Sequence, residues 1–262
     1  MAEWMAEEWD RRWKVIKVYR NEWKYTLTNQ ELSLLKSRLS QVMELDSHTP
    51  PGGRYLIHSL YFDDYKDMSV YTTDAGLSKR FKWRIRYYGN DLSYIVLEKK
   101  EKREGRCHKK SCKLTVEEYK SIVSGDIMDI AYDTDKNLIR ELAVDMLCYD
   151  YRPKVIIDYE RIAYVEEITN VRITFDMKIS ASYELEKFLD GDYLNYYILP
   201  SGLNVLEVKF DDILPSYIRN IVESYNFKQG SFSKYYFSRK ILDCYMRWIW
   251  KIIVFTVLNY ID

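Results

Sequence analysis

Basic side chains alternate with bulky apolar side chains in the segment Lys82–Tyr87 (KWRIRY). Successive side chains of a β-strand point to opposite faces, so Lys82, Arg84 and Arg86 would share one face of a strand. A guanidinium group can bind two phosphate oxygens at once, and a lysine adds a compact positive charge. This face is therefore suited to binding phosphate groups.

The same alternation recurs in five other segments and gathers charged side chains on one face of each. These faces hold Glu22 and Lys24; Glu98, Lys100 and Lys102; Tyr159 and Arg161; Arg172, Thr174, Asp176 and Lys178; and Glu207 and Lys209. The glutamates matter because carboxylate oxygens are the ligands that Mg²⁺ and Mn²⁺ prefer. Together the strands indicate a surface for phosphate groups and a divalent metal.

An antiparallel sheet often turns one charged face to water, and this explanation suffices for any single strand here. The set differs because its polar faces are nearly all Arg, Lys and Glu. If the strands close into an antiparallel β-barrel with helices outside, the charged faces point inward together. Buried unpaired cations cost several kcal/mol each, so such an interior requires a polyanion and a metal. We therefore expect a nucleotide triphosphate or inorganic polyphosphate as the ligand.

Charge is unevenly distributed along the chain. The whole sequence has 40 basic and 40 acidic residues, whereas residues 79–113 carry a net charge of +9. A nucleic-acid-binding patch would give a similar excess. However, neither an RNP-like nor a helix-turn-helix pattern is present, so we do not expect nucleic acid as a partner.

Helices are indicated at four places between the strands. Capping boxes at Thr28 and at Thr115, each with a glutamate three residues later, predict two helix starts. Helical spacing predicts a third helix at 138–147, and Pro215 is expected as the first residue of a fourth. We expect one α+β domain over residues 1–262, with an N-terminal helix (1–18) and an apolar C-terminal helix (246–262) as appendages.

Neither terminus nor the cysteines indicate export. The first residues, MAEWMAEEWDRRW, are too polar for a signal peptide, and the four cysteines show no CxxC spacing. We expect reduced thiols and a cytoplasmic location. The apolar C-terminus is shorter than the roughly 20 residues of a membrane span. We expect it to pack on the domain or on a second copy in a homo-oligomer; a shallow membrane contact is the alternative.

Eight short motifs, in order from Tyr19 to Leu242, resemble the VTC domain, the polyphosphate polymerase branch of the triphosphate tunnel (CYTH-like) superfamily. They are NEWKY (21–25), HSLYFD (58–63), KWRIRYY (82–88), LEKK (97–100), YERIAY (159–164), VRITFD (171–176), LEVK (206–209) and SKY (233–235). Each motif alone is weak, and the resemblance depends on their order. It implies a closed eight-stranded antiparallel barrel, the triphosphate tunnel.

The resemblance implies an ATP-dependent inorganic polyphosphate polymerase, with ATP and polyphosphate or pyrophosphate as partners and Mn²⁺ or Mg²⁺ as cofactor. The implied catalytic residues are Arg84, Arg86, Lys100, Arg161, Arg172 and Lys209. The implied substrate-binding residues are Lys24, Lys82, Tyr159, Ser233 and Lys234. The implied metal ligands are Glu207, Glu22 and Glu98.

Two other functions remain open from the residues. One is a metal-dependent triphosphatase on the same scaffold, which would activate water with a carboxylate or a lysine. The other is a catalytically silent module that binds polyphosphate. Arg84, Arg86 and Glu207 favour an active phosphotransferase, because the transfer of a phosphoryl group needs positioning and charge neutralisation.

Overall fold

The computed structural model describes residues 19–224, 227 and 229–259, with only the backbone from residue 249 onward. The expected N-terminal helix (1–18) lies outside the described residues. The strands are β1 (Asn21–Thr28), β2 (Glu44–Leu45), β3 (Tyr55–Asp63), β4 (Lys79–Tyr88), β5 (Asp91–Arg103), β6 (Arg106–Leu114), β7 (Arg152–Glu166), β8 (Val171–Ser182), β9 (Tyr196–Tyr197) and β10 (Leu203–Phe210). The helices are α2 (Asn29–Leu39), α3 (Met68–Asp74), α4 (Val116–Ser124), α5 (Ile127–Asp133), α6 (Asn137–Tyr149), α7 (Ser216–Glu223) and α8 (Lys234–Asn259), with a 3₁₀ turn at Leu185–Lys187.

Eight strands form one antiparallel path in the order β1-β10-β8-β7-β3-β4-β5-β6, and two short strands pair at its side. The sheet is rolled, so that its first and last strands meet. Arg20 and Cys107 exchange backbone hydrogen bonds of 2.9 and 2.8 Å there. The expected α+β class with a large antiparallel sheet is confirmed.

The predicted closed barrel is not confirmed as a continuous ladder. Within the described residues the two edge strands share one isolated bridge, between Arg20 and Cys107. In this antiparallel register, residues of β6 after Cys107 would face residues before Arg20, whereas β1 begins at Asn21. The edge strands therefore overlap only at their ends, where Cys107 Sγ also donates to the carboxylate of Glu22 at 3.2 Å.

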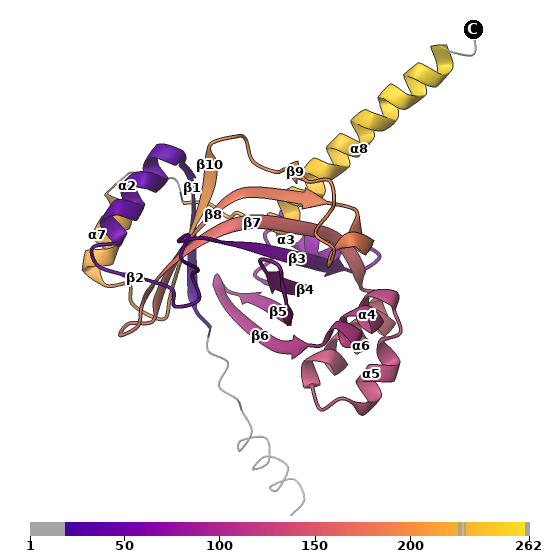
Figure 1. Ribbon diagram of the computed structural model, residues 1–262, viewed down its shortest axis with the longest axis horizontal. Coiled ribbons are helices and arrows are strands. Elements are labelled where there is room, and N and C mark those ends of the chain that lie inside the picture. The colour runs from indigo at the N-terminus through magenta and orange to yellow at the C-terminus, as the bar shows by residue number, and fades with distance from the viewer. Residues whose placement is uncertain (1–18, 225–226, 228, 260–262) are drawn as a thin grey trace, which may run out of the picture.

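Helices cover the outer face of the rolled sheet in two groups (Figure 1). One apolar cluster packs α4, α5 and α6 on β3, β4 and β5 and contains Trp83 and Ile85. The other packs α2 and α7 on β1, β8 and β10 and contains Phe175 and Val208. Because the outward side chains are apolar, alternation turns the charged side chains inward.

The predicted helix starts are confirmed in local detail. Thr28 and Thr115 accept hydrogen bonds from the backbone of Glu31 and Glu118, whose side chains bond back to the threonine backbone. Pro215 is the residue that caps α7 rather than its first helical residue, a difference of one position. Helices α3 and α5 were not predicted; each has only seven residues, too few for a clear helical period.

The C-terminal apolar segment is the end of one long helix, α8, rather than a separate appendage. Its first part packs against the sheet, where Tyr235 and Leu242 are buried, whereas Trp248 is 63% exposed. Figure 1 shows the rest of α8 leaving the sheet. The expected packing on the domain therefore ends near Leu242. Among the described residues, none of the helices is long and apolar enough to cross a membrane.

Candidate functional site

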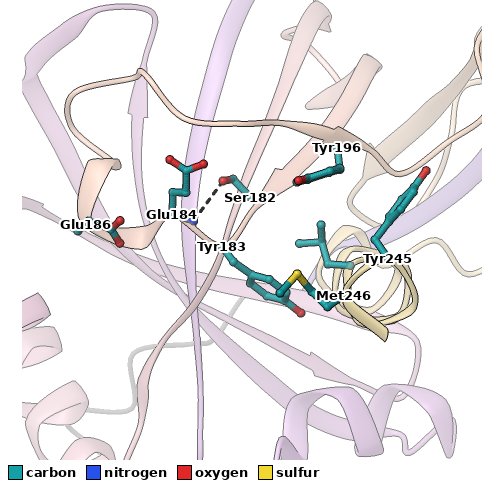
Figure 2. Close-up of a pocket in the computed structure, with 8 residues that line it drawn as sticks. Ser182, Tyr183, Glu184, Glu186, Tyr196, Tyr245 and Met246 are labelled. Carbon is teal, nitrogen blue, oxygen red and sulfur yellow. Dashed lines mark hydrogen bonds between the residues drawn. The ribbon is translucent and has the colours of Figure 1, made fainter. Parts of the chain in front are cut away.

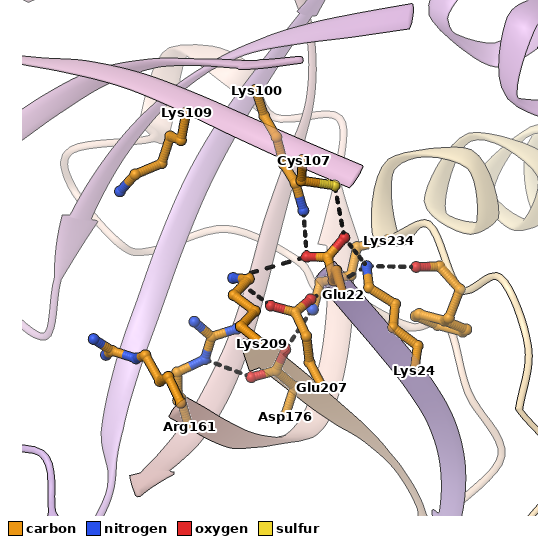
Figure 3. Close-up of polar contacts among 12 residues, drawn as sticks. Glu22, Lys24, Lys100, Cys107, Lys109, Arg161, Asp176, Glu207, Lys209 and Lys234 are labelled. Carbon is orange, nitrogen blue, oxygen red and sulfur yellow. Dashed lines mark hydrogen bonds and ion pairs between the residues drawn. The ribbon is translucent and has the colours of Figure 1, made fainter. Parts of the chain in front are cut away.

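Strands β1 and β10 place a row of alternating charges on the inner face of the rolled sheet (Figure 3). In their register, Glu22 faces Lys209 and Lys24 faces Glu207. Lys24 Nζ lies 3.2 Å from Glu207 and 3.8 Å from Glu22, and Lys209 Nζ lies 2.5 Å from Glu207. Lys100 of β5 reaches Glu22 at 2.6 Å, and Cys107 of the edge strand β6 lies 3.2 Å from the same carboxylate, so this cluster also links β1 to the other end of the sheet.

Both glutamates of this cluster are charged despite their burial. Burial and the nearby Glu207 raise the pKa of Glu22, but Lys100, Lys24 and Lys209 outweigh them and lower it to about 2. For Glu207, burial also raises the pKa, and the surrounding lysines hold it well below its ordinary value. Two carboxylates can stay ionised side by side here only because lysines separate them.

Strands β4, β5 and β6 form a second cluster around Glu98, which is 1% exposed. Its carboxylate accepts 2.6 Å hydrogen bonds from Arg84 Nε and Lys109 Nζ, and Arg86 lies at 3.8 Å. Arg86 also donates to the hydroxyl of Tyr159 at 2.8 Å. The two arginines are thus held side by side on one strand, as the sequence predicted.

A third cluster links β7, β8 and the start of α8. Arg161 forms a bidentate pair with Asp176, at 2.6 and 2.8 Å. Lys234 bonds the same carboxylate at 2.5 Å and lies 4.6 Å from the centre of the Tyr159 ring. Asp176 is fully buried; burial raises its pKa, but Arg161 and Lys234 hold it well below the ordinary value.

The segment before α8 crosses the interior from β1 to β4. Lys24 donates to the carbonyl of Phe232 at 3.0 Å, and Ser233 Oγ lies 3.0 Å from Lys82 Nζ. Lys234 then reaches Asp176 on β8. The side chains of SKY (233–235) therefore belong to the interior, although they are far in sequence from the strands.

The interior has more positive than negative charge. Four of the buried interior carboxylates each contact at least two cations, so most cations share a partner; the four are Glu22, Glu98, Glu207 and Asp176. Shared partners leave hydrogen-bonding capacity and positive charge unsatisfied. A ligand with several linked negative charges fits such an arrangement.

The family model for the VTC domain matches residues 19–243, which is most of the chain. The chain belongs to the VTC domain family. A search of curated protein sequences gave no match.

Solved structures similar to this VTC domain are distant. A putative adenylate cyclase from Bacillus halodurans is 13% identical with a TM-score of 0.47, covering 82% of this chain and 93% of that one. PH1819 protein from Pyrococcus horikoshii OT3 is 14% identical (TM-score 0.40; 79% and 86% covered), and the Mimivirus capping enzyme triphosphatase is 11% identical (TM-score 0.34; 85% and 92% covered). We draw no argument about function from these similarities.

Most of the predicted site residues of this VTC domain lie on the inner face, but they form separate clusters. Glu98 shares none of its cations with Glu22 or Glu207, so the three predicted metal ligands are not brought together. Arg172 lies toward the rim, 37% exposed, and pairs with Asp46 outside these clusters. Within the described residues, no group of three or more His, Cys, Asp or Glu side chains could hold a metal by itself.

Three inner-face residues were missed as site residues. Asp176 and Lys109 each complete a cluster, and Tyr61 accepts a 2.9 Å hydrogen bond from Arg84 Nη1. Burial raises the pKa of Tyr61, but Arg84, Arg86 and Lys234 lower it to about 8. Two of them could have been found from the sequence. Asp176 shares a strand face with Arg172, and Tyr61 lies within the motif HSLYFD.

A separate pocket lies where α8 leaves the domain (Figure 2). It has a volume of about 250 Å³ and is lined by Ser182, Tyr183, Glu184, Glu186, Tyr196, Leu242, Tyr245 and Met246. Among the described residues, no lysine or arginine lines this pocket, so its lining is not suited to phosphate groups.

Replacing Asp176 with asparagine should destabilise the ligand-free protein by about 3–5 kcal/mol, because Arg161 and Lys234 would lose a buried partner. Urea unfolding at pH 7 measures this change. Asp212→Asn is the control, since that side chain is 83% exposed and its pair with Arg106 should contribute less than about 1 kcal/mol.

The effect should shrink in acid. The pKa of Asp176 is lower in the folded than in the unfolded protein, so its contribution is present above about pH 4 and is lost as the pH falls further. An equal loss of stability in both variants would contradict the assigned role of Asp176.

Proposed function

We propose that this VTC domain is a metal-dependent polyphosphate polymerase that transfers the γ-phosphate of ATP to a growing chain of inorganic polyphosphate. In this reaction the bond between the γ-phosphorus and its bridging oxygen breaks, and a terminal oxygen of the chain forms a new bond to that phosphorus. ADP leaves. The attacking phosphate oxygen is already ionised, so the reaction requires no general base.

The observation that carries the proposal is the excess of cations over carboxylates inside the rolled sheet. Arg84, Arg86, Arg161, Lys100 and Lys209 come from four strands and lie on one inner face. Transfer of a phosphoryl group depends mainly on in-line positioning and on charge neutralisation. A ring of arginines and lysines supplies both for a linear chain of phosphates.

Hydrogen bonds also fix the orientation of the two arginines on β4, Arg84 and Arg86. Arg86 Nε donates to Ser59 at 3.1 Å, and Arg84 is held between Glu98 and Tyr61. A guanidinium held on one side presents its remaining N–H groups to a ligand with little loss of conformational entropy. We propose that Glu98 positions the arginines and that, unlike Glu207, it is not a metal ligand.

The donor set fits a divalent ion bound together with its substrate. Glu22 and Glu207 are buried carboxylates that contact the same two lysines, Lys24 and Lys209. Magnesium is commonly held by one or two carboxylates plus substrate phosphates and water, so two glutamates suffice. A bound Mn²⁺ or Mg²⁺ would neutralise phosphate charge, and Glu207 with Glu22 would hold it.

Thin-layer chromatography of labelled ATP incubated with the purified protein and Mn²⁺ tests the proposed function. We expect labelled material that stays at the origin and is degraded by a polyphosphatase. Release of orthophosphate alone would show a triphosphatase instead. If neither product forms but polyphosphate binds tightly, the protein is a binding module.

Tripolyphosphate should raise the melting temperature by several degrees, and sulfate much less at equal ionic strength. A ligand that binds only the folded state stabilises it by about 2.7 kcal/mol at one hundred times its dissociation constant. Linked phosphates can contact several clusters at once, whereas sulfate reaches one. Equal shifts from the two anions in thermal scans would mean that the cations act by general screening, and would contradict a polyphosphate site.

A further inference from the structure

Lys82 differs in its partners from the lysines of the three ion-pair clusters. Among the described residues it has no carboxylate partner, and its Nζ contacts two hydroxyl groups instead. Thr73 Oγ1 lies at 2.8 Å and Ser233 Oγ at 3.0 Å. Because hydroxyls carry no charge, an anionic ligand at this lysine does not compete with a carboxylate.

The two hydroxyls come from different parts of the chain, helix α3 and the residue just before α8, and both contact Lys82. Thr73 is in α3, and its own hydroxyl hydrogen goes to the carbonyl of Ser69, so it accepts from the lysine. Ser233 precedes α8, and its oxygen also accepts from the backbone N–H of Tyr236. The lysine is thus positioned by two fixed acceptors, and the N-terminal end of α8 lies beside it.

We propose that Lys82, with Thr73 and Ser233, forms a phosphate subsite that binds one phosphate group of the polyphosphate ligand and takes up a proton when that group binds. The inference rests on the proposed function for the identity of the ligand. The lysines of the three ion-pair clusters must release a carboxylate to bind phosphate, whereas the ammonium of Lys82 has a third N–H to donate while the two hydroxyls hold it in place.

Proton uptake follows from the surroundings of Lys82. Burial, followed by Arg80 on its own strand, Lys24 on β1 and Lys100 on β5, lowers its pKa to about 7, and Asp63 on β3 opposes this only weakly. The ring of Tyr235 on α8 also lies near, with its centre 5.9 Å from Lys82 Nζ. An anion placed at Nζ favours the charged form.

The sign of the pH dependence is therefore defined. At pH 7.5 a substantial fraction of Lys82 is neutral in the free protein and becomes charged in the complex. The ammonium forms when the amine accepts a proton from the buffer. Affinity for polyphosphate should decrease as the pH rises above about 7.

Calorimetric titration with tripolyphosphate at pH 7.5, in two buffers of different ionisation enthalpy, measures the protons taken up. We expect Lys82→Arg, which stays charged at all pH values, to bind tripolyphosphate but to take up less than half the protons of the wild type. The ligand's own proton change is common to both proteins. If Lys82→Arg does not fold, Lys82→Gln must show the same loss of uptake, with weaker binding.

Thr73→Ala and Thr72→Ala form a matched pair for the geometry. Both hydroxyls donate to a carbonyl one helical turn earlier, but only Thr73 contacts Lys82. We expect several-fold weaker binding for Thr73→Ala and no change for Thr72→Ala.

Undiminished proton uptake in Lys82→Arg, or in Lys82→Gln if that variant is used, would overturn the subsite, as would equal affinities of the two threonine variants. No tripolyphosphate binding by the wild type would instead overturn the proposed function.

Discussion

Replacing Arg84 with alanine should lower the rate of phosphoryl transfer by about 100- to 1,000-fold. Removing one fixed donor that stabilises charge in a transition state commonly has an effect of this size. Arg84 is suited to this role because Glu98 and Tyr61 hold it on the inner face, where it is only 14% exposed. Steady-state kinetics with ATP and Mn²⁺ measure the change.

Arg84→Lys and Arg219→Ala are the controls for this result. A lysine keeps the charge but not the planar fork, so its rate should lie between those of alanine and the wild type. Arg219 is exposed on α7, and its substitution should leave the rate unchanged. Near-normal turnover in both Arg84→Ala and Arg86→Ala would contradict the proposed phosphate contacts.

Replacing Glu207 with glutamine should abolish the metal-dependent activity while the protein still binds tripolyphosphate. An amide is a weaker ligand for a hard divalent ion than a carboxylate. Without the negative charge, Lys24 and Lys209 would be more available to phosphate, so metal-free affinity should not decrease. Activity assays and Mn²⁺ binding by electron paramagnetic resonance measure the loss of metal function, and calorimetric titration with tripolyphosphate in the absence of metal measures the retained affinity.

The matched control is Glu44→Gln, an exposed glutamate in the short strand β2. It should change neither activity nor Mn²⁺ binding. Full activity of Glu207→Gln, or wild-type activity that survives exhaustive chelation, would contradict a metal role for this residue.

The sequence predicted the strands and their faces because both depend on local alternation. In a strand, alternate side chains of KWRIRY and LEVK lie on the same face, and this does not depend on contacts with the rest of the chain. The capping boxes were equally local, since the side chains of a threonine and of the glutamate three residues later each accept a hydrogen bond from the other residue's backbone N–H. Apolar outer faces under helices then followed from the need to bury them.

The pairing inside the rolled sheet could not be predicted in the same way. Glu22 contacts Lys100, which is 78 residues away in the sequence, and Lys234 contacts Asp176, which is 58 residues away. Such contacts depend on strand order and register, which a single alternating segment does not define. For this reason Glu98 was grouped with the metal ligands, whereas the structure surrounds it with two arginines and Lys109.

The segment that crosses the interior before α8 was also beyond local reasoning. Phe232 and Ser233 have no periodic pattern around them, and their place depends on contacts with Lys24 and Lys82. The start of α8 was expected at residue 246, where the apolar end begins, whereas the helix begins at Lys234 and its first part packs against the sheet. It runs without Gly or Pro from Lys234 to Asn259.

A crystal structure of the protein with tripolyphosphate and Mn²⁺ tests the central claim, that the inner face of the rolled sheet binds linked phosphates. We expect the phosphates inside the sheet, in contact with Arg84, Arg86, Arg161 and Lys82, and the ion beside Glu207. Phosphate found only on the outer surface, with the interior ion pairs of Glu22, Glu98 and Asp176 unchanged, would contradict the claim.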